Sequence, residues 1–440
     1  MPLIETSQPR SRALQEKARR LIPGGTHTYA KSDDQFPENA PGFMVRGAGC
    51  HAWDADGNEY IEYGMGLRAV TLGHAFAPVI EAVAAQLPLG SNFTRPAAIE
   101  VDCAEEILDL LPGADMVKFC KDGSMAVDGA IKLARLHTGR DMVAICGDHP
   151  FFSTNDWFIG STEMPGGIPE LVRKLTVKFR YNNLASLESL FAQYPNCIAC
   201  IVMEATRTEE PLPGFLESLK SCAHRHGAVF ILDEMITGFR WHLRGAQHTY
   251  GITADLATFG KALANGFSVS ALTGKRELMQ LGGGDHERER VFLLSTTHGA
   301  ETHCLAAAIA TMRFYKQHPV IETLYERGKR LRLGIQRTIA ELKLEAYFDL
   351  DSRDCNLIYG TRDADCKPSQ CFRTLFLQEI IRRGVIAPSF VTSFSHSEAD
   401  IDRTIEVVSE ALVIYRRALE EGIEKYLVGR SVTPVFRRFA

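Results

Sequence analysis

Short apolar runs alternate with amphipathic stretches through the middle of the chain. Four runs are nearly free of polar residues: "MVKFC" at 116, "MVAICG" at 142, "CIACIVME" at 197 and "AVFILDE" at 228. Helical patterns at 124–139 and 215–226 lie between them. Apolar strands that alternate with helices predict a parallel sheet covered by helices on both faces.

The two ends of the chain carry a different pattern. Residues 43–63 predict strands around a tight turn, because Asp56-Gly57 is a hairpin signal between aromatic and β-branched residues. After about residue 305 the sequence becomes rich in helical patterns, and a charged helix is expected near the end. The length of 440 residues favours two domains. We therefore predict a large α/β domain over 76–305 and a smaller α+β domain built from 1–75 and 306–440.

Composition and charge narrow the class of protein. The net charge of -5 and pI near 6.3 argue against a nucleic-acid-binding surface. We see no apolar run that could span a membrane, and the polar start of the sequence lacks the apolar centre of a signal peptide. We therefore expect a cytoplasmic protein without a nucleic-acid or membrane partner.

The cysteines and histidines do not predict a metal site. The 11 cysteines are scattered, and those in or beside apolar segments favour buried free thiols in a reducing compartment. Cys197 and Cys200 form one C-x-x-C pair inside an apolar run, and no second pair follows. His298 and His303 are five residues apart, a spacing that does not place them on one helix face. We predict no metal.

Two apolar segments end beside groups of opposite charge. Asp233 closes the run at 228, and Lys261 follows "LATFG". Ligands of an open parallel sheet gather at the carboxyl ends of its strands, so both side chains could face one crevice. One interpretation is a structural ion pair. The other is a lysine that forms a Schiff base with a carbonyl cofactor, and an acid that holds the cofactor's ring nitrogen.

Neighbouring strand ends offer further groups for such a cofactor. Gly123 permits a tight turn and Ser124 can cap the following helix, whose N-terminus suits an anion. The turn matches neither a Walker A motif nor a dinucleotide fingerprint. Phe151 or Phe152, after the next strand, could stack on a flat ring, and Glu204 would project into the same crevice. Trp157 and Phe158, further along this aromatic loop, are better explained by core packing.

Six motifs in a fixed order resemble one family. They are "IPGGTHTYA" at 22, "WDADGNEYIEY" at 53, "LGHAFAPVIEAV" at 72, "VKFCKDGSMAVDGAIKLARLHTGR" at 117, "LDEMITGFR" at 232 and "FGKALANGFSVSALTGKRE" at 259. The chain resembles the class III pyridoxal-phosphate-dependent aminotransferases of fold type I, and within them the glutamate-1-semialdehyde aminomutase-like group. The resemblance implies a large domain with a mostly parallel sheet sandwiched by helices and a smaller α+β domain from both termini.

The resemblance also implies roles for single residues. Lys261 resembles the lysine that carries the cofactor as an internal aldimine and moves the proton. Asp233 resembles the partner of the pyridinium nitrogen. Met235 takes the place of a residue, usually valine, on the back face of the ring. The implied cofactor is pyridoxal 5'-phosphate, with pyridoxamine 5'-phosphate as its intermediate form.

The remaining implied positions concern the phosphate and the assembly. Gly123 and Ser124 resemble the phosphate-binding turn. Thr297 resembles a threonine that reaches the phosphate of the neighbouring subunit, which implies a homodimer with active sites at the interface.

The chain departs from the family at several positions. Phe151, or alternatively Phe152, stands where a tyrosine is usual, and Asp122 stands beside the phosphate turn. Lys31 takes the place of a carboxylate-binding arginine, and Arg68 is a candidate replacement.

The implied activity is transfer of an amino group from an amino acid, expected to be glutamate, to an oxo-acceptor. The acceptor could be a keto sugar, a biosynthetic aldehyde or a keto acid. The alternative is an intramolecular aminomutase of the glutamate-1-semialdehyde type. A non-catalytic binding module is disfavoured by the presence of both Asp233 and Lys261.

Overall fold

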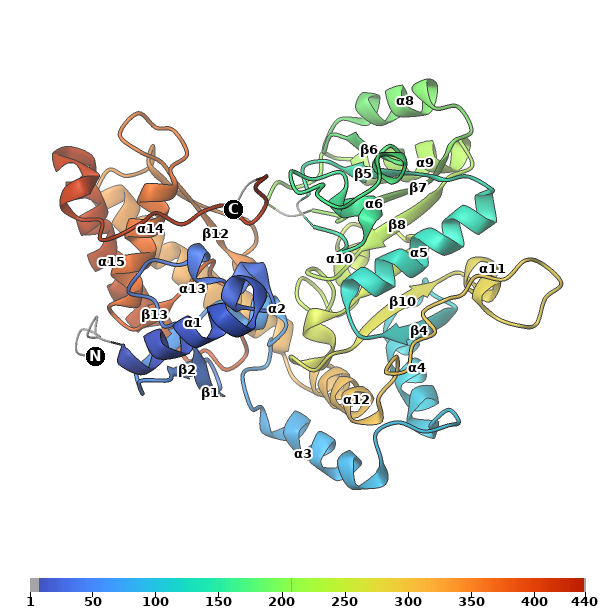
Figure 1. Cartoon of the computed structure of the whole chain (residues 1–440), viewed down its shortest axis with the longest axis horizontal. Coiled ribbons are helices and arrows are strands. Elements are labelled where there is room, and N and C mark those ends of the chain that lie inside the picture. Colours follow the sequence, from blue (N-terminus) through green and yellow to red (C-terminus); the bar gives the residue numbers. More distant parts are fainter. Residues whose placement is uncertain (1–7, 150, 207, 439–440) are drawn as a thin grey trace. The chain divides into compact units, whose positions relative to one another are not determined.

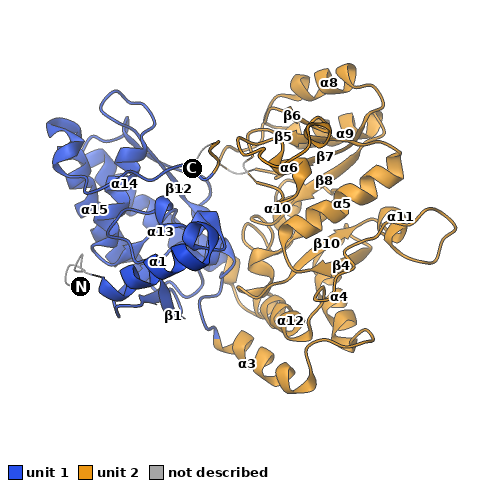
Figure 2. Ribbon diagram, in the orientation of Figure 1, with its two compact units in different colours: residues 1–76, 322–435 blue, residues 77–321, 436–440 orange. Residues whose placement is uncertain are grey.

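The chain divides into two compact units (Figures 1 and 2). A computed structural model describes residues 8–149, 151–206 and 208–438. Unit 1 comprises residues 1–76 and 322–435, and unit 2 comprises 77–321 and 436–440. None of the helices within the described ranges is long and apolar enough to cross a membrane.

Unit 2 is built on a seven-stranded sheet in the order β4-β10-β9-β8-β7-β5-β6. Its strands are β4 (Met116–Cys120), β5 (Met142–Cys146), β6 (Thr176–Phe179), β7 (Ile198–Met203), β8 (Val229–Asp233), β9 (Leu256–Phe259) and β10 (Ser270–Gly274). All are parallel except β10, which runs antiparallel to both β4 and β9. The predicted mostly parallel sheet is confirmed, and the four apolar runs form four of its strands.

Helices cover this sheet, as the ribbon shows (Figure 1). The longer ones are α3 (Ala77–Gln86), α4 (Ala98–Leu110), α5 (Gly123–Thr138), α8 (Leu184–Gln193), α9 (Phe215–Arg225) and α12 (Thr302–Gln317). The apolar side of α5, with Val127 and Ile131, packs in one core with Val143, Val202 and Ile231 of the strands. Burial of such side chains is worth about 1.5–3 kcal/mol each, which holds α5 and its N-terminus against the sheet.

Short helices complete unit 2, and α12 marks where it ends. The short helices are α6 (Asp156–Ile159), α7 (Glu170–Arg173), α10 (Gly245–Thr249), α11 (Arg276–Met279), η4 (Leu87–Leu89), η5 (Lys261–Ala264) and η6 (Gln280–Gly282). The longer helix, α12, packs against α3, α4 and η5. This helix therefore belongs to unit 2, which extends to residue 321.

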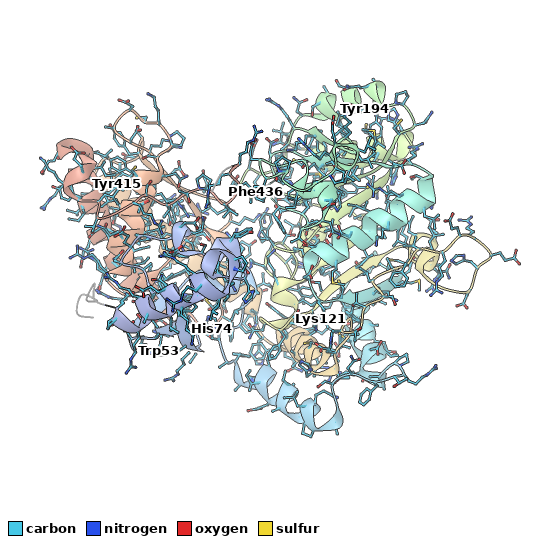
Figure 3. All side chains as sticks on the ribbon, viewed as in Figure 1. Trp53, His74, Lys121, Tyr194, Tyr415 and Phe436 are labelled. Atoms are coloured by element: carbon cyan, nitrogen blue, oxygen red, sulfur yellow. The ribbon has the colours of Figure 1, made fainter. Side chains whose placement is uncertain are left out.

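Unit 1 combines a four-stranded sheet, a hairpin and helices. Its strands are β1 (Met44–Ala48), β2 (His51–Asp54), β3 (Glu59–Glu62), β11 (Phe348–Asp351), β12 (Ile358–Thr361) and β13 (Val385–Ile386). Its longer helices are α1 (Pro9–Leu21), α13 (Val320–Glu341), α14 (Gln370–Ile381) and α15 (Glu398–Glu421), and its short ones are α2 (Met65–Arg68), η1 (Pro23–Gly25), η2 (Tyr29–Lys31), η3 (Asp33–Gln35), η7 (Asp354–Asn356) and η8 (Ile423–Lys425). Tyr415, on α15, lies in an aromatic core with Phe348 and Phe372 (Figure 3).

The predicted turn at Asp56-Gly57 is confirmed as the hairpin between β2 and β3. The buried Asp54 carboxylate closes it by accepting the N–H groups of Asp56 (2.9 Å) and Asn58 (2.8 Å).

The cysteines are free thiols, and most are buried. Cys197 is an exception to the expected burial: it precedes β7, outside the sheet, and is exposed, whereas Cys200 within β7 is buried.

Candidate active site

Asp233 and Lys261 start from the same edge of the sheet of unit 2. Asp233 is the last residue of β8, and Lys261 follows the end of β9 with only Gly260 between. The two strands are parallel neighbours in which Asp233 pairs with Thr258. The lysine and the carboxylate therefore both belong to the carboxyl edge, where ligands of such sheets gather.

The Asp233 carboxyl is almost fully buried, with 3% of its surface exposed. Burial raises its pKa to about 6, against the opposing effects of the Lys261 charge and of a hydrogen bond from the N–H of Met235 (2.8 Å). A carboxylate kept from water is stabilised by a cationic partner, which a protonated heterocyclic nitrogen can supply.

The backbone at Lys261 adopts an unusual conformation. Its φ of +45° lies in the left-handed region, which costs a non-glycine residue about 1–2 kcal/mol. A Cβ at the preceding Gly260 would lie 2.5 Å from Ser270 Oγ and 2.7 Å from Met235 Sδ. The chain thus approaches its neighbours closely where it turns to present the lysine, and such local strain is frequent at functional sites.

The N-terminus of α5 follows the end of β4 at this carboxyl edge. Asp122 is its N-cap and accepts the N–H of Met125 (2.9 Å), so this carboxylate is bound to the first turn of the helix. Ser124 Oγ accepts the N–H of Thr154 (3.1 Å). Because that bond uses a lone pair of the hydroxyl, its proton is left to donate to another acceptor.

The two candidate stacking residues have different surroundings. Phe152 is buried in the core around α5, whereas Phe151 is exposed and meets Phe158 edge to face at a ring distance of 5.6 Å. Trp157 and Phe158 are buried in the same core, which confirms their interpretation as packing residues.

One carboxylate fastens the aromatic loop to α5. Asp128 accepts a hydrogen bond from Ser153 Oγ (2.9 Å) and another from Trp157 Nε1 (2.6 Å). Burial raises the pKa of Asp128. The loop after β5 and the helix that begins at Gly123 are thereby held as one assembly.

Glu204 is joined at the carboxyl edge by a histidine that the sequence analysis missed. Glu204 directly follows β7, and its N–H donates to His149 Nδ1 (3.1 Å). Both side chains are buried. Since Nδ1 accepts, Nε2 carries the proton of a neutral imidazole. The available signal was position alone, because His149 lies three residues beyond the end of β5.

Thr297 lies in an exposed segment that precedes α12. Its carbonyl accepts a hydrogen bond from Asn92 Nδ2 (2.9 Å). Four residues later, Glu301 forms an ion pair of 2.7 Å with Lys121, which Figure 3 labels and which lies two residues before Gly123.

Lys31 and Arg68 belong to unit 1. Lys31 is exposed at the end of η2. Arg68 donates to Asn356 Oδ1 (2.8 Å) and Ser389 Oγ (3.0 Å) within its own unit. Their assignment to a substrate carboxylate stays a prediction.

Comparison with known proteins identifies the family of the chain. Residues 33–344 match the family model of class III aminotransferases. A glutamate-1-semialdehyde 2,1-aminomutase of Syntrophobacter fumaroxidans is 31% identical over 92% of this chain and 98% of its own. A 3-aminobutyryl-CoA aminotransferase of Cloacimonas acidaminovorans is 28% identical over 93% and 98% of the two chains.

Solved structures show the same fold. The FumI protein of Sphingopyxis sp. MTA144, in its PLP internal aldimine form, superposes with a TM-score of 0.86 at 27% identity, over 94% of this chain and 98% of that one. An omega-transaminase from Sphaerobacter thermophilus gives a TM-score of 0.83 at 25% identity, over 92% and 98%. The chain therefore belongs to the class III aminotransferases, enzymes of fold type I that use pyridoxal phosphate.

Proposed function

We propose that the chain transfers an amino group from an amino acid, with glutamate as the expected donor, to a small oxo-acceptor. The observation that supports this most is the placement of Asp233 and Lys261. A buried carboxyl and a lysine with strained backbone stand at the ends of neighbouring strands. A keto sugar, an aldehyde or a keto acid is the proposed acceptor.

The residues of this edge fit pyridoxal phosphate. Asp233 would hold the ring nitrogen, and the N-terminus of α5 with the Ser124 hydroxyl would hold the phosphate. Met235 Sδ stands where a Cβ at either Gly123 (2.8 Å) or Gly260 (2.7 Å) would contact it, and we assign it to the back face of the ring. Phe151 keeps an exposed ring and is favoured over Phe152 for the other face.

The chain's own groups then have separate tasks. The bound cofactor supplies a carbonyl that takes up the amino group and a cationic ring that withdraws electrons. Lys261 Nζ would hold the cofactor covalently and would move a proton at the donor's α-carbon. Asp233 would keep the ring nitrogen protonated, because a cationic ring stabilises a buried carboxylate. Glu204 and His149 border the same edge and would limit the approach of water.

Covalent attachment at Lys261 can be tested directly. Borohydride reduction of the cofactor-loaded protein should fix the label to the peptide that contains Lys261. The Lys261→Ala variant should still bind pyridoxal phosphate yet lose turnover by several orders of magnitude. Lys275→Ala is the matched control, since Lys275 pairs with Asp255 at 3.1 Å elsewhere in unit 2. A label on another lysine contradicts the assignment.

An intramolecular aminomutase is the second candidate, because several relatives near 30% identity bear that name. The two functions differ in a half-reaction with glutamate alone. A transaminase should release about one equivalent of 2-oxoglutarate per active site without any acceptor, while the cofactor changes to its amine form. Failure with every free amino donor, combined with turnover of an amino aldehyde, would favour the aminomutase.

We further propose that the active form is a homodimer. Large apolar side chains are exposed along residues 80–101 of unit 2: Ile80, Leu87, Leu89, Phe93 and Val101. The Thr297 segment is bound to this stretch, because Asn92 holds the Thr297 carbonyl and Thr302 Oγ1 donates to the Gly90 carbonyl (2.6 Å). A second copy that covers this apolar stretch would meet Thr297, in agreement with its proposed role at the neighbouring phosphate.

A further inference from the structure

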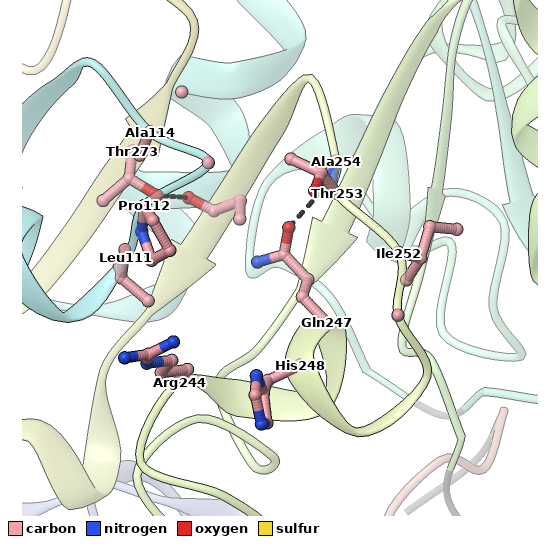
Figure 4. A pocket seen from close by; sticks show the side chains of 14 residues that line it. Leu111, Pro112, Ala114, Arg244, Gln247, His248, Ile252, Thr253, Ala254 and Thr273 are labelled. Carbon is pink, nitrogen blue, oxygen red and sulfur yellow. Dashed lines mark hydrogen bonds between the residues drawn. The ribbon is translucent and has the colours of Figure 1, made fainter.

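Unit 2 contains a cavity of about 280 Å³ (Figure 4). Residues 111–114, which precede β4, form part of its wall, together with Ala257 near the start of β9 and Gly274 at the end of the antiparallel β10. These positions all belong to the amino edge of the parallel strands. The cavity is therefore at the opposite edge from Asp233 and Lys261.

The lining of the cavity combines apolar side chains with polar ones. Leu111, Pro112 and Ile252 contribute hydrocarbon surface. Gln247 Oε1 accepts the N–H of Ala254 (2.8 Å), as the dashed line in Figure 4 shows. This bond uses the amide oxygen, so the NH₂ group of this lining residue is left to donate to another acceptor. The volume is near the lower end of cavities that hold small molecules, about 300–1,000 Å³.

Two basic side chains stand in the same cavity. Arg244 lines it, and its guanidinium has no hydrogen bond or ion pair with any residue that the structure describes. The Arg244 charge contributes to lowering the pKa of Asp109, whose carboxylate is already paired with Lys316 at 2.8 Å. His248 also lines the cavity, and its ring is stacked on His242 at a distance of 3.9 Å. The stack fixes the imidazole without using its nitrogens.

We propose that this cavity binds a small organic carboxylate. A guanidinium presents a planar pair of donors that matches a carboxylate, and the Gln247 amide adds a neutral donor. The apolar part of the lining, with Leu111, Pro112 and Ile252, suits a short hydrocarbon body, which inorganic anions lack. The site is independent of the proposed transamination, because none of its lining residues comes from the carboxyl edge.

Hexanoate is a suitable probe, because it joins a carboxylate to a short apolar chain. Calorimetric titration of the cofactor-loaded protein should give saturable binding, with one hexanoate per chain in this cavity. Arg244→Gln should weaken that binding by roughly tenfold or more, and His248→Gln should weaken it less. Arg290→Gln is the matched control, since Arg290 is also exposed and does not line the cavity. Equal melting temperatures would show that the variants are folded.

Three further arms decide between the proposal and its competitors. Hexan-1-ol, which has the chain without the charge, and inorganic phosphate, which has charge without the chain, should each bind at least about tenfold more weakly. The absorption of the cofactor should stay unchanged during the titration. Three results would each overturn the proposal. They are unchanged hexanoate binding in Arg244→Gln, hexanoate binding that always changes the absorption of the cofactor, and phosphate binding as tight as that of hexanoate.

Discussion

The Asp233 carboxyl holds its proton more tightly in the folded, cofactor-free chain than in the unfolded chain. Burial raises its pKa from 3.8 to about 6, although Lys261 and the Met235 N–H oppose the change. A raised carboxyl pKa favours the folded state only while the group is protonated. Stability is therefore lost as the pH rises between these two values, and the difference amounts to roughly 3 kcal/mol.

The loss of stability with rising pH that Asp233 causes should disappear in the Asp233→Asn variant. Urea unfolding of cofactor-free wild type should show a free energy of unfolding that falls by roughly 3 kcal/mol more than that of the variant from pH 4 to pH 7. Bound cofactor should abolish the difference in slope, because its cationic ring pairs with the carboxylate. Parallel pH profiles of wild type and variant without cofactor would contradict the buried, proton-holding state of Asp233.

Ser124 provides a second test at the scale of a residue. Its oxygen accepts the Thr154 N–H, which leaves the hydroxyl proton for the phosphate. Loss of one hydrogen bond to a charged group costs about 1.5–3 kcal/mol, so Ser124→Ala should weaken binding of pyridoxal phosphate by roughly 10- to 100-fold in equilibrium dialysis. Ser161→Ala is the control, because Ser161 Oγ donates to the Phe158 carbonyl (2.8 Å) instead. An unchanged affinity in Ser124→Ala would remove the hydroxyl from the phosphate site.

Individual residues of the candidate site were predictable from the sequence where they lie at the end of a strand. Asp233 and Lys261 each follow an apolar run, and the parallel pairing of β8 and β9 brings both to one edge. His149 was not predictable in this way, because its contact with the Glu204 N–H depends on the path of an irregular loop. In the same loop, Phe151 is exposed and Phe152 is buried, a difference that the sequence pattern does not predict.

At the scale of elements, the loop after β5 is fastened to α5 through Asp128. Ser153 and Trp157 both donate to this carboxylate. Asp128→Ala leaves both donors without their acceptor, and we expect a cost of about 2 kcal/mol to local stability. Amide hydrogen exchange of residues 151–159 should then be faster by roughly 30-fold.

The conservative variant separates the hydrogen bonds from the charge. Asp128→Asn keeps an oxygen for the two donors, so most of the exchange protection should return. Asp156→Ala removes a carboxylate from the same loop and should leave the protection largely intact, since Asp156 is exposed. Equal exchange in Asp128→Ala and wild type would show that the loop is held by its buried aromatic rings alone.

The elements with continuous apolar runs were the ones that the sequence predicted well. Strands buried on both faces have no polar alternation, and β5, β7 and β8 carry that signature along their whole length. The reversed direction of β10 was not predictable, since strand direction leaves no trace in composition. Helices were expected after about residue 305, but the packing of α12 on α3 and α4 follows from tertiary contacts that periodicity does not report.

At the scale of the whole molecule, the exposed apolar side chains at 80–101 are the reason to expect a homodimer. Leu89 and Phe93 expose 68% and 53% of their surfaces in the single chain. Such clustered exposure is unfavourable in water and is typical of an interface. If Thr297 serves the neighbouring subunit's phosphate, assembly and cofactor affinity must change together.

Phe93→Asp should therefore have two effects. Light scattering at micromolar concentration should give the mass of a dimer for wild type and of a monomer for the variant, because a charge buried in an apolar interface lacks a partner. Pyridoxal phosphate affinity should fall in the same variant, since the partner's contribution is lost. Leu171→Asp is the matched control: Leu171 exposes 79% of its surface on α7, outside the apolar stretch, and this variant should keep both properties. A dimeric Phe93→Asp protein, or a monomeric one with full cofactor affinity, would contradict a shared active site.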